Sequence, residues 1–222
     1  MENLIFTAGI LVAAIVSYLF GSVNFAIIVT SKFMKGEDIR NHGSGNAGMT
    51  NVLRTVGKIP ALLTLLGDLL KSVIAAIFSY FIFVLLGYEQ WGVIGMLIGS
   101  ASAFTGHLYP IYYKFKGGKG VLSTAGVFLI IDWRITVTCV IIFILMLAIT
   151  KIVSISSLVG VGMIVPTVVA YLLIDGVPVD AGFIGKIIVG LYITVIVTIK
   201  HKENIKRLKA GIEPKIGQKI AK

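Results

Sequence analysis

Long apolar runs constrain this chain more than any other feature of its sequence. Most of them approach the roughly 20 residues with which an α-helix crosses a ~30 Å hydrocarbon layer. The runs cover residues 4–30, 59–86, 91–109, 121–131, 135–150, 153–174 and 183–199. Only 14% of the 222 residues are charged and 57% are hydrophobic, whereas about a quarter of a soluble domain is charged. This composition excludes a soluble globule, a disordered chain and a fibrous repeat, and it indicates an integral membrane protein.

The runs should form helices, because they are continuous rather than alternating in polarity and a backbone in lipid must satisfy its own hydrogen bonds. We therefore predict an all-α integral membrane protein, a single membrane domain over 1–222 with seven transmembrane helices. The run 121–131 would reach only about 17 Å at 1.5 Å per residue and could instead join the run 135–150 in one long helix. The sequence Asp132-Trp133-Arg134 between them favours a turn at the membrane surface.

Basic residues decide the orientation of these helices. The net charge is +10, and with seven crossings seventeen of the twenty Lys and Arg residues fall on one side. The positive-inside tendency then predicts an outside amino terminus and a cytoplasmic carboxyl terminus. Six crossings would place Lys151 and the basic tail outside. No basic stretch precedes the first run, so we expect that run to be an anchor and not a cleaved signal.

Three segments on the predicted cytoplasmic side, 31–58, 106–120 and 200–222, are richer in polar residues than simple connectors need to be. In the first, Gly43, Gly45 and Gly48 permit positive φ and a close approach of backbone N–H groups to an anion. Neutral donors and one guanidinium suited to phosphate accompany them: Ser44, Asn46, Thr50, Asn51 and Arg54. The alternative interpretation of this segment is a flexible, capped turn.

The second segment delivers the turn Gly117-Gly118-Lys119-Gly120 to the start of the fourth run. The amino terminus of a helix offers unpaired N–H groups to an anion, and Lys119 adds a full charge. The Walker A pattern is absent because Val121 follows Gly120. Other lysines of this segment, and those of the basic tail, are typical of contacts to anionic membrane lipids.

In the third segment, His201 and Asn204 are three residues apart and would share a helix face. Within the second run, Asp68 and Lys71 show the same spacing, so we expect them to face the protein interior, where they either neutralise one another or support a nearby phosphate site. The histidines, His42, His107 and His201, are too dispersed to indicate metal binding, and Cys139 stands alone. We expect no metal and no cofactor.

Together the three segments resemble a known family. The patterns are His-Gly-Ser-Gly-Asn-x-Gly-x-Thr-Asn-Val-Leu-Arg at 42–54, Gly-His-x-x-Pro with Phe-Lys-Gly-Gly-Lys-Gly within 106–120, and His-x-x-Asn-x-x-Arg-Leu at 201–208. In this order they are similar to the bacterial acylphosphate-dependent glycerol-3-phosphate acyltransferases of the PlsY family. The resemblance implies transfer of a fatty acyl group from acyl phosphate to the sn-1 hydroxyl of glycerol 3-phosphate. The products would be lysophosphatidic acid, for phospholipid biosynthesis, and phosphate.

The resemblance also implies a site on the cytoplasmic side of the bacterial cell membrane. The expected catalytic residues are Ser44, Arg54, Lys119, His201 and Asn204. The expected substrate-binding residues are Gly43, Gly45, Asn46, Thr50, Asn51, His107, Gly117, Gly118, Gly120, Ser157 and Arg207. Asp68, Lys71 and Glu213 are expected to support them. We expect direct transfer with Ser44 as a hydrogen-bonding positioner, and His201 or a substrate phosphate oxygen as the proton acceptor.

Two rival hypotheses come from other functional classes. A membrane transporter for a phosphorylated anion would suit seven helices and basic loops, but its charges should line the whole path and not only Asp68 and Lys71. A membrane scaffold held by the basic tail would leave three glycine-containing polar loops without a purpose. The sequence indicates neither a nucleic-acid partner nor a particular oligomeric state.

Overall fold

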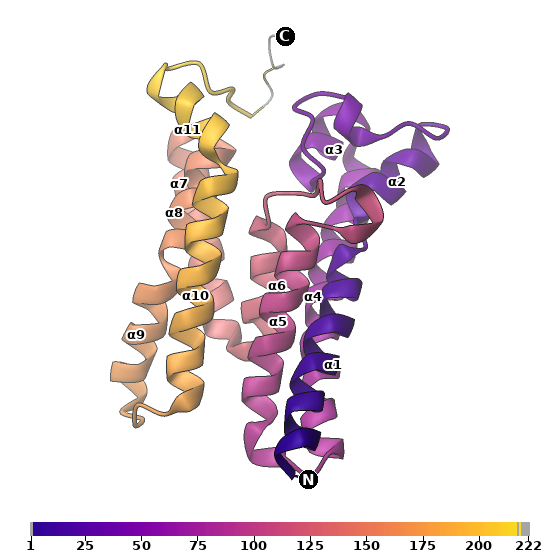
Figure 1. Cartoon of the computed structure of the whole chain (residues 1–222). Coiled ribbons are helices and arrows are strands. Elements are labelled where there is room, and N and C mark those ends of the chain that lie inside the picture. Colours follow the sequence, from indigo (N-terminus) through magenta and orange to yellow (C-terminus); the bar gives the residue numbers. More distant parts are fainter. Residues whose placement is uncertain (1, 217, 219–222) are drawn as a thin grey trace. The chain divides into compact units, whose positions relative to one another are not determined.

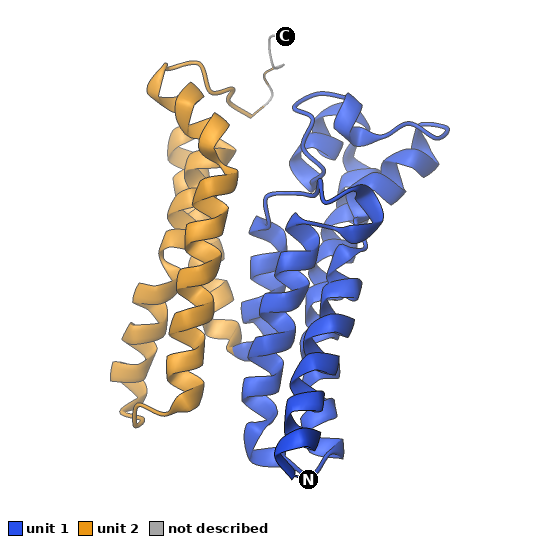
Figure 2. Cartoon of the chain, in the orientation of Figure 1, with its two compact units in different colours: residues 1–131 blue, residues 132–222 orange. Residues whose placement is uncertain are grey.

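The computed structural model describes residues 2–216 and 218, and all regular secondary structure in that part of the chain is helical. Lys219 and Lys222 of the basic tail lie outside the described residues. Contacts divide the chain into two compact units, residues 1–131 and 132–222 (Figure 2). The single domain expected over 1–222 stays a prediction.

Unit 1 is a bundle of long helices with shorter helices and loops at one end (Figure 1). Its elements are α1 (Glu2–Ser22), α2 (Phe25–Phe33), η1 (Ile39–Asn41), α3 (Met49–Thr55), α4 (Lys58–Leu85), η2 (Glu89–Trp91), α5 (Gly92–Leu108), η3 (Ile111–Tyr113) and α6 (Val121–Ile131). Helix α1 packs against α4 and α5, and α4 packs against α5 and α6.

Small residues let the helices of unit 1 approach closely, as is usual where lipid removes the hydrophobic drive between helices. A Cβ at Gly21 of α1 would lie 2.0 Å from the carbonyl oxygen of Ala103 in α5. The hydroxyls of Ser17 and Ser79 are 2.8 Å apart between α1 and α4. Large side chains such as Leu85 instead point outward, as expected for a surface covered by lipid acyl chains.

The first apolar run, expected as one helix over 4–30, is broken at Val23 and Asn24. Asn24 has extended backbone angles, and its side-chain oxygen accepts a hydrogen bond from the N–H of Ile27 at 3.1 Å. It therefore caps a new helix, α2, and hydropathy alone gives no sign of this break because the flanking residues are apolar.

Unit 2 is a second helical bundle, and its described residues form the helices α7 (Trp133–Thr150), α8 (Val153–Gly162), α9 (Ile164–Asp175), α10 (Ala181–Lys200) and α11 (Lys202–Lys209). Helices α8 and α9 continue one another through Met163. Pro166 lies just after this junction and has no N–H to donate to the carbonyl of Gly162, which accounts for the interruption. The Arg134 guanidinium bonds Asp132 and Asp175, each at 2.9 Å, and so ties the start of α7 to the end of α9.

Helices occupy all seven predicted runs. The division of 121–150 is confirmed, since α6 ends at Ile131 and the side chain of Asp132 caps α7 by accepting from the N–H of Arg134 at 3.2 Å. Five segments of the described chain are long and apolar enough to cross a membrane: Glu2–Phe33, Lys58–Leu85, Trp133–Thr150, Val153–Asp175 and Ala181–Lys200. Helices α5 and α6, with 17 and 11 residues, are shorter. The count of seven crossings and the orientation of the termini stay predictions.

Candidate functional site

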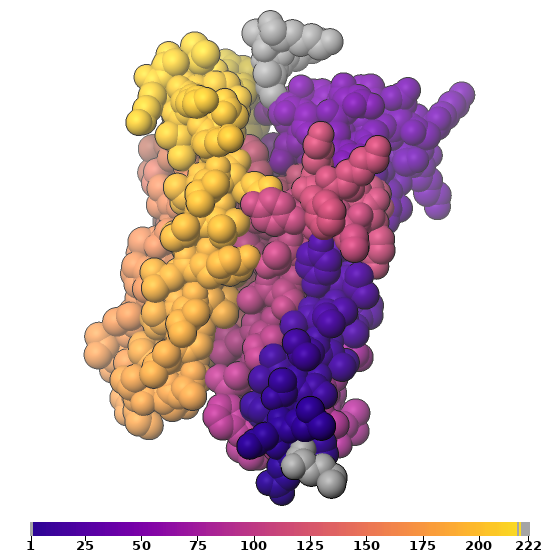
Figure 3. Space-filling model, viewed as in Figure 1, coloured from indigo at the N-terminus to yellow at the C-terminus, as the bar shows by residue number. Residues whose placement is uncertain are grey.

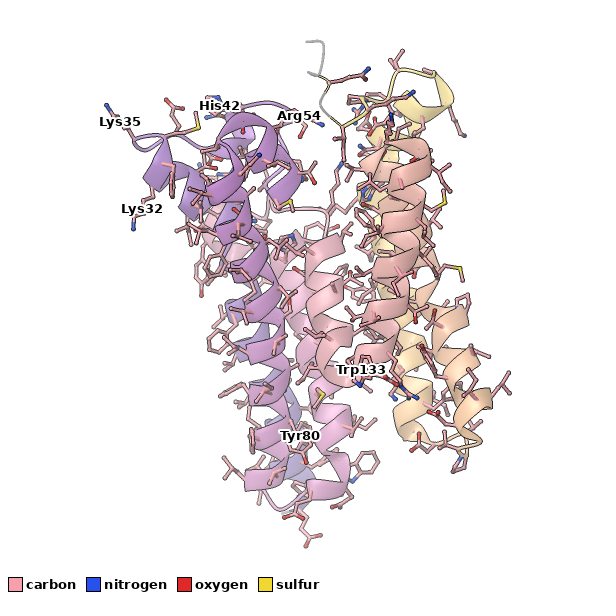
Figure 4. All side chains as sticks on the ribbon, turned by 180° about the vertical axis from the view of Figure 1, so that it is seen from behind. Lys32, Lys35, His42, Arg54, Tyr80 and Trp133 are labelled. Atoms are coloured by element: carbon pink, nitrogen blue, oxygen red, sulfur yellow. The ribbon has the colours of Figure 1, made fainter. Side chains whose placement is uncertain are left out.

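Polar loops gather at one end of unit 1. Lys32, Lys35, His42 and Arg54 lie at this end, and Tyr80 of α4 lies near the opposite end (Figure 4). The space-filling view shows the purple 25–55 segment and the rose segment near residue 115 next to each other there (Figure 3). The first loop packs against a small hydrophobic cluster formed by α2, η1, α3, α4 and Ala47 of the loop itself. Its buried residues are Ala26, Ile27, Ile39, Ala47, Val52 and Ala61.

The side chain of Asn51, at the start of α3, holds the first loop together. Its Oδ1 accepts from the N–H of Ser44 at 2.9 Å, and its Nδ2 donates to the carbonyls of His42 at 2.9 Å and Asn46 at 3.1 Å. Asn51 is buried, with 2% of its surface exposed. The amide thus braces the loop from within, and the substrate contact expected of Asn51 stays a prediction.

Two glycines make this arrangement sterically possible. Gly43 and Gly45 have φ of 57° and 70°, the left-handed region that side chains with a Cβ rarely adopt. A Cβ at Gly43 would also lie 2.2 Å from Asn51 Oδ1. The turn itself therefore requires Gly43 and Gly45, whereas Gly48 has φ of −160°, an extended conformation that any residue adopts.

Arg40 joins the first loop to the second. Its Nη1 donates to the carbonyls of Tyr113 at 2.9 Å and Lys116 at 3.3 Å, while its Nη2 bonds the Asp38 carboxylate at 2.6 Å. The hydrogen bond from Arg40 holds the pKa of Asp38 below its ordinary value. Sequence reasoning missed this role, because nothing in the spacing of Asp38 and Arg40 points to carbonyl groups more than 70 residues away.

Ser44, Asn46, Thr50 and Arg54 are side chains of the first loop that remain available to a ligand, since none of them has a hydrogen-bond or ion-pair partner for its side chain among the described residues. Arg54 is half-buried in the last turn of α3, and Ser44 is exposed. Neither the Arg54 guanidinium nor the Ser44 hydroxyl has a hydrogen-bond or ion-pair partner among residues 2–216 and 218. An unpaired arginine beside a glycine-rich turn is suited to a phosphate group, in contrast to Arg40, whose donors are used within the protein.

The second loop packs its glycines against the end of α5. The N–H groups of Gly117 and Gly118 donate to the carbonyls of Leu108 at 3.3 Å and His107 at 3.2 Å. A Cβ at Gly117 would lie 2.0 Å from the His107 carbonyl oxygen, so a larger residue could not lie here. Lys119 is half-buried in this loop, and Gly120 has φ of 87°.

The loop leads directly into α6, whose first turn has unpaired N–H groups as every helix start does. Ser123, in this turn, is fully buried, and its hydroxyl has no hydrogen-bond partner among the described residues. A buried donor without a partner at a helix amino terminus suits an anionic ligand. Ser123 could not be predicted from the sequence, because a lone serine in an apolar run carries no distinguishing pattern.

Asp68 and Lys71 form the predicted internal pair in α4. Lys71 Nζ lies 2.9 Å from Asp68 Oδ1, and both side chains are almost completely buried. His107 is also buried and completes the cluster, with its Nδ1 3.0 Å from Lys71 Nζ and 3.6 Å from Asp68 Oδ1. The substrate contact expected of His107 stays a prediction.

Unit 2 gathers a second polar cluster around Glu213. The Glu213 carboxylate accepts from Asn204 Nδ2 at 2.6 Å, Ser154 Oγ at 2.8 Å and Arg207 Nε at 2.7 Å. Burial raises the pKa of this carboxyl, but the hydrogen bonds outweigh burial and hold the pKa below its ordinary value. The predicted supporting role of Glu213 has a physical basis here, since it fixes Asn204 and Arg207; Ser154 was not foreseen.

His201, at the end of α10, has a defined tautomer. Its Nδ1 lies 2.8 Å from the carbonyl oxygen of Val197, which can only accept a hydrogen bond, so Nδ1 carries the proton. In the neutral ring Nε2 is then the basic nitrogen. Ser157 is buried in α8.

The expected site residues thus fall into both units. Those numbered up to 120 lie in the two loops of unit 1 and in the helices beneath them, and the hydrogen bonds of Arg40 show that these two loops meet. Ser157, His201, Asn204, Arg207 and Glu213 lie in unit 2. That the two groups form one site stays a prediction.

Comparisons with known proteins identify the family. Residues 11–211 match the family described as glycerol-3-phosphate acyltransferase. The chain is 41% identical to the glycerol-3-phosphate acyltransferase of Clostridioides difficile strain 630, over 94% of this chain and 96% of that protein. It is 40% identical to the one from Ruegeria pomeroyi, over 94% and 93% of the two chains.

Two solved structures have the same fold. The crystal structure of PlsY (YgiH), an integral membrane glycerol 3-phosphate acyltransferase, in its glycerol 3-phosphate form has a TM-score of 0.79 and 28% identity, covering 94% of this chain and 96% of that one. The lysophosphatidic acid form has a TM-score of 0.77 and 27% identity, over 94% and 95%. The chain therefore belongs to the glycerol-3-phosphate acyltransferase family and is an integral membrane acyltransferase of the PlsY type.

Proposed function

We propose that this enzyme takes its acyl group from an acyl phosphate and transfers it to the sn-1 hydroxyl of glycerol 3-phosphate, at the cytoplasmic face of a bacterial membrane. The products are lysophosphatidic acid and inorganic phosphate. Both substrates carry a phosphate group, so the site must hold two such groups. The observation that carries the proposal is Arg54, a half-buried guanidinium at a glycine-rich loop with no acidic partner among the described residues.

Each site residue has a part in this reaction. Arg54 and Lys119 bind phosphate, with the N–H groups of the first turn of α6 as further donors. Ser44 donates a hydrogen bond that orients a substrate. Asn204, fixed by Glu213, acts likewise. Holding the hydroxyl against the acyl carbonyl makes the reaction effectively unimolecular, and the cations stabilise the departing phosphate.

The chemistry is a direct transfer. The glycerol hydroxyl oxygen attacks the acyl carbonyl carbon, a new C–O ester bond forms, and the bond from that carbon to the phosphate oxygen breaks. The phosphate leaves with the electron pair. The hydroxyl proton passes to His201 Nε2, the basic nitrogen of the tautomer set by Val197, or to a phosphate oxygen. An acyl phosphate is already activated, so no acyl-serine intermediate on Ser44 is needed.

The decisive experiment measures phosphate release by purified protein given acyl phosphate, before and after addition of glycerol 3-phosphate. Release should depend on glycerol 3-phosphate, and the lipid product should carry its acyl chain at sn-1. Acyl-CoA and acyl carrier protein thioester should not replace acyl phosphate. Efficient turnover with either thioester, or sn-2 product, would contradict the proposal.

Substitution tests the phosphate assignment. Arg54→Gln should lower kcat/KM about 100-fold or more, the range seen when a charge-assisted contact to the reacting group is lost. Lys35→Gln is the matched control, because Lys35 is exposed at the same end of unit 1 and no site role is assigned to it (Figure 4). Near-normal turnover in Arg54→Gln would refute the assignment.

A single-turnover trial tests the direct route. Labelled acyl phosphate is mixed with the enzyme in the absence of glycerol 3-phosphate, and the protein is then separated from lipid. We expect no label on the protein. One acyl group per enzyme molecule, lost in Ser44→Ala, would establish an acyl-serine intermediate instead.

A further inference from the structure

The ammonium group of Lys71 links three segments of unit 1. Its Nζ donates to the carbonyl of Val23 at 2.5 Å, contacts His107 Nδ1 at 3.0 Å, and pairs with Asp68 Oδ1 at 2.9 Å. Val23 and His107 thus take hydrogen bonds from the ammonium, while Asp68 balances its charge as an ion pair. Val23 lies at the break between α1 and α2, and His107 lies in the last turn of α5.

The contact between Lys71 Nζ and His107 Nδ1 determines the tautomer of the His107 ring. An ammonium can only donate, so Nδ1 of His107 accepts, and Nε2 carries the ring proton in the neutral form. Nε2 faces the glycine loop, since a Cβ at Gly118 would lie 2.3 Å from it. The His107 carbonyl accepts the N–H of Gly118 at 3.2 Å, so ring and backbone of one residue both support the loop.

A simpler interpretation is that Asp68 and Lys71 only neutralise one another inside the membrane protein. Two buried charges need only each other for that purpose. Lys71 makes more contacts than charge neutralisation requires. Its ammonium also bonds Val23 and His107, and His107 contacts the loop that precedes α6.

We propose that Lys71 is a positioning residue for the reaction. Through His107 it holds the Gly117–Gly118 turn against the end of α5 and so fixes the phosphate-binding loop that carries Lys119. The catalytic part of this inference rests on the proposed function above. The structural part, the hold on the loop, does not.

The double variant Asp68→Asn/Lys71→Met separates the two interpretations. It removes both charges together and so leaves no unpaired buried charge. If the pair only neutralises itself, the variant should behave like wild type. If Lys71 positions the loop, the protein should remain folded, while the amides of Gly117 and Gly118 exchange hydrogen for deuterium about fivefold faster or more, as the loss of one hydrogen bond predicts.

Kinetics give the second readout. The KM for at least one phosphate-bearing substrate should rise about tenfold or more in the double variant, with a smaller fall in kcat, because the loop is displaced while the reacting groups remain. Lys32→Met is the matched control, since Lys32 is exposed on α2 of the same unit (Figure 4). It should leave KM and exchange within about twofold of wild type, the usual result for a surface site.

His107→Phe is a second variant for the same measurements, to be used if the double variant does not fold. This substitution leaves Asp68 and Lys71 paired and retains an aromatic ring, but removes the acceptor for Lys71. Loop exchange and KM should change as in the double variant. Wild-type values for both in either folded variant would overturn the positioning role.

The two proposals fail in different ways. If wild-type enzyme releases no phosphate from acyl phosphate, the proposed function fails, while hydrogen exchange of the loop still tests Lys71. If the wild type is active and the exchange of the loop is unchanged in the variants, the positioning role fails and the function stands.

Discussion

Two arginines of the first loop, 14 residues apart, have opposite surroundings. Arg40 is surrounded by acceptors from its own chain, namely Asp38 and the carbonyls of Tyr113 and Lys116. Arg54 has none among the described residues, although both sit at the same end of unit 1. Residue type alone does not distinguish these roles; only the partners do.

This contrast predicts different outcomes for Arg40 and Asp38 substitutions. Arg40→Gln should release the second loop from the first and cost about 1–3 kcal/mol of stability, as when a partly buried charged hydrogen-bond group is lost. Faster proteolysis within residues 110–117 and a higher KM should accompany this. Asp38→Asn should have a smaller effect, because the bonds from Arg40 to the two carbonyls remain. Equal loss in the two variants would contradict the role of Arg40 as the link between the loops.

The Glu213 cluster should make unit 2 sensitive to acid. The pKa of Glu213 is held below its ordinary value, so its hydrogen bonds contribute stability above about pH 4.3, and this contribution is lost as the pH falls through the lowered pKa. Thermal unfolding in detergent from pH 7 to pH 3 should show this loss in wild type.

Glu213→Gln is the control for that acid sensitivity. It cannot ionise, so it should be less stable than wild type at pH 7, and the difference should shrink toward pH 3. A constant difference across this range would show that the carboxylate charge is not what holds Asn204 and Arg207.

Hydropathy predicted the positions of the long helices, but it did not predict the breaks within the apolar runs. The ends of α6 and the start of α7 followed from Asp132-Trp133-Arg134, because charged residues beside an apolar run leave a clear signal. The break at Asn24 depends on one side-chain cap, and the junction at Met163 depends on one proline three residues further on. Such single-residue effects are hidden in long apolar sequences.

In the candidate site, too, features local to a motif could be predicted and contacts between distant residues could not. The positive φ of Gly43 and Gly45 was predictable, because it is local to the motif, and the phosphate contacts of Arg54 and Lys119 stay predictions. The brace by Asn51, the Arg40 link and the contact of Lys71 with His107 were not predictable. These depend on which backbone and side-chain atoms meet after folding, often from residues far apart in the chain.

Close packing of α1 on α5 gives a prediction for whole helices. A Cβ at Gly106 would lie 2.3 Å from the backbone oxygen of Tyr18, and backbone atoms cannot move aside cheaply. Gly106→Ala should therefore destabilise the protein by about 1–3 kcal/mol, the cost of overpacking. Gly162→Ala is the matched control, since its Cβ would meet nothing within 4 Å, and it should be neutral or stabilising. Equal melting temperatures for the two variants would refute the close approach.

For the whole molecule, charge and helix order together predict the topology. Seventeen of twenty basic residues share one side only if the chain crosses seven times. The short helices α5 and α6 must then count as crossings, although α6 alone spans about 17 Å of a ~30 Å layer. If α6 did not cross, the helices after it would reverse and the basic tail would lie outside.

Single cysteines can decide between these topologies. In a Cys139→Ser background, Lys35→Cys, Val179→Cys and Lys209→Cys each place one thiol at an exposed position. With seven crossings, a membrane-impermeant maleimide added to intact cells should label only Val179→Cys, and the other two should react after permeabilisation. Six crossings would instead expose Lys209→Cys and protect Val179→Cys, because every segment after α6 would change sides. The labelling of Lys35→Cys and Lys209→Cys is the critical comparison. The predicted cytoplasmic site includes residues from both units, so Lys35 and Lys209 must lie on the same side of the membrane.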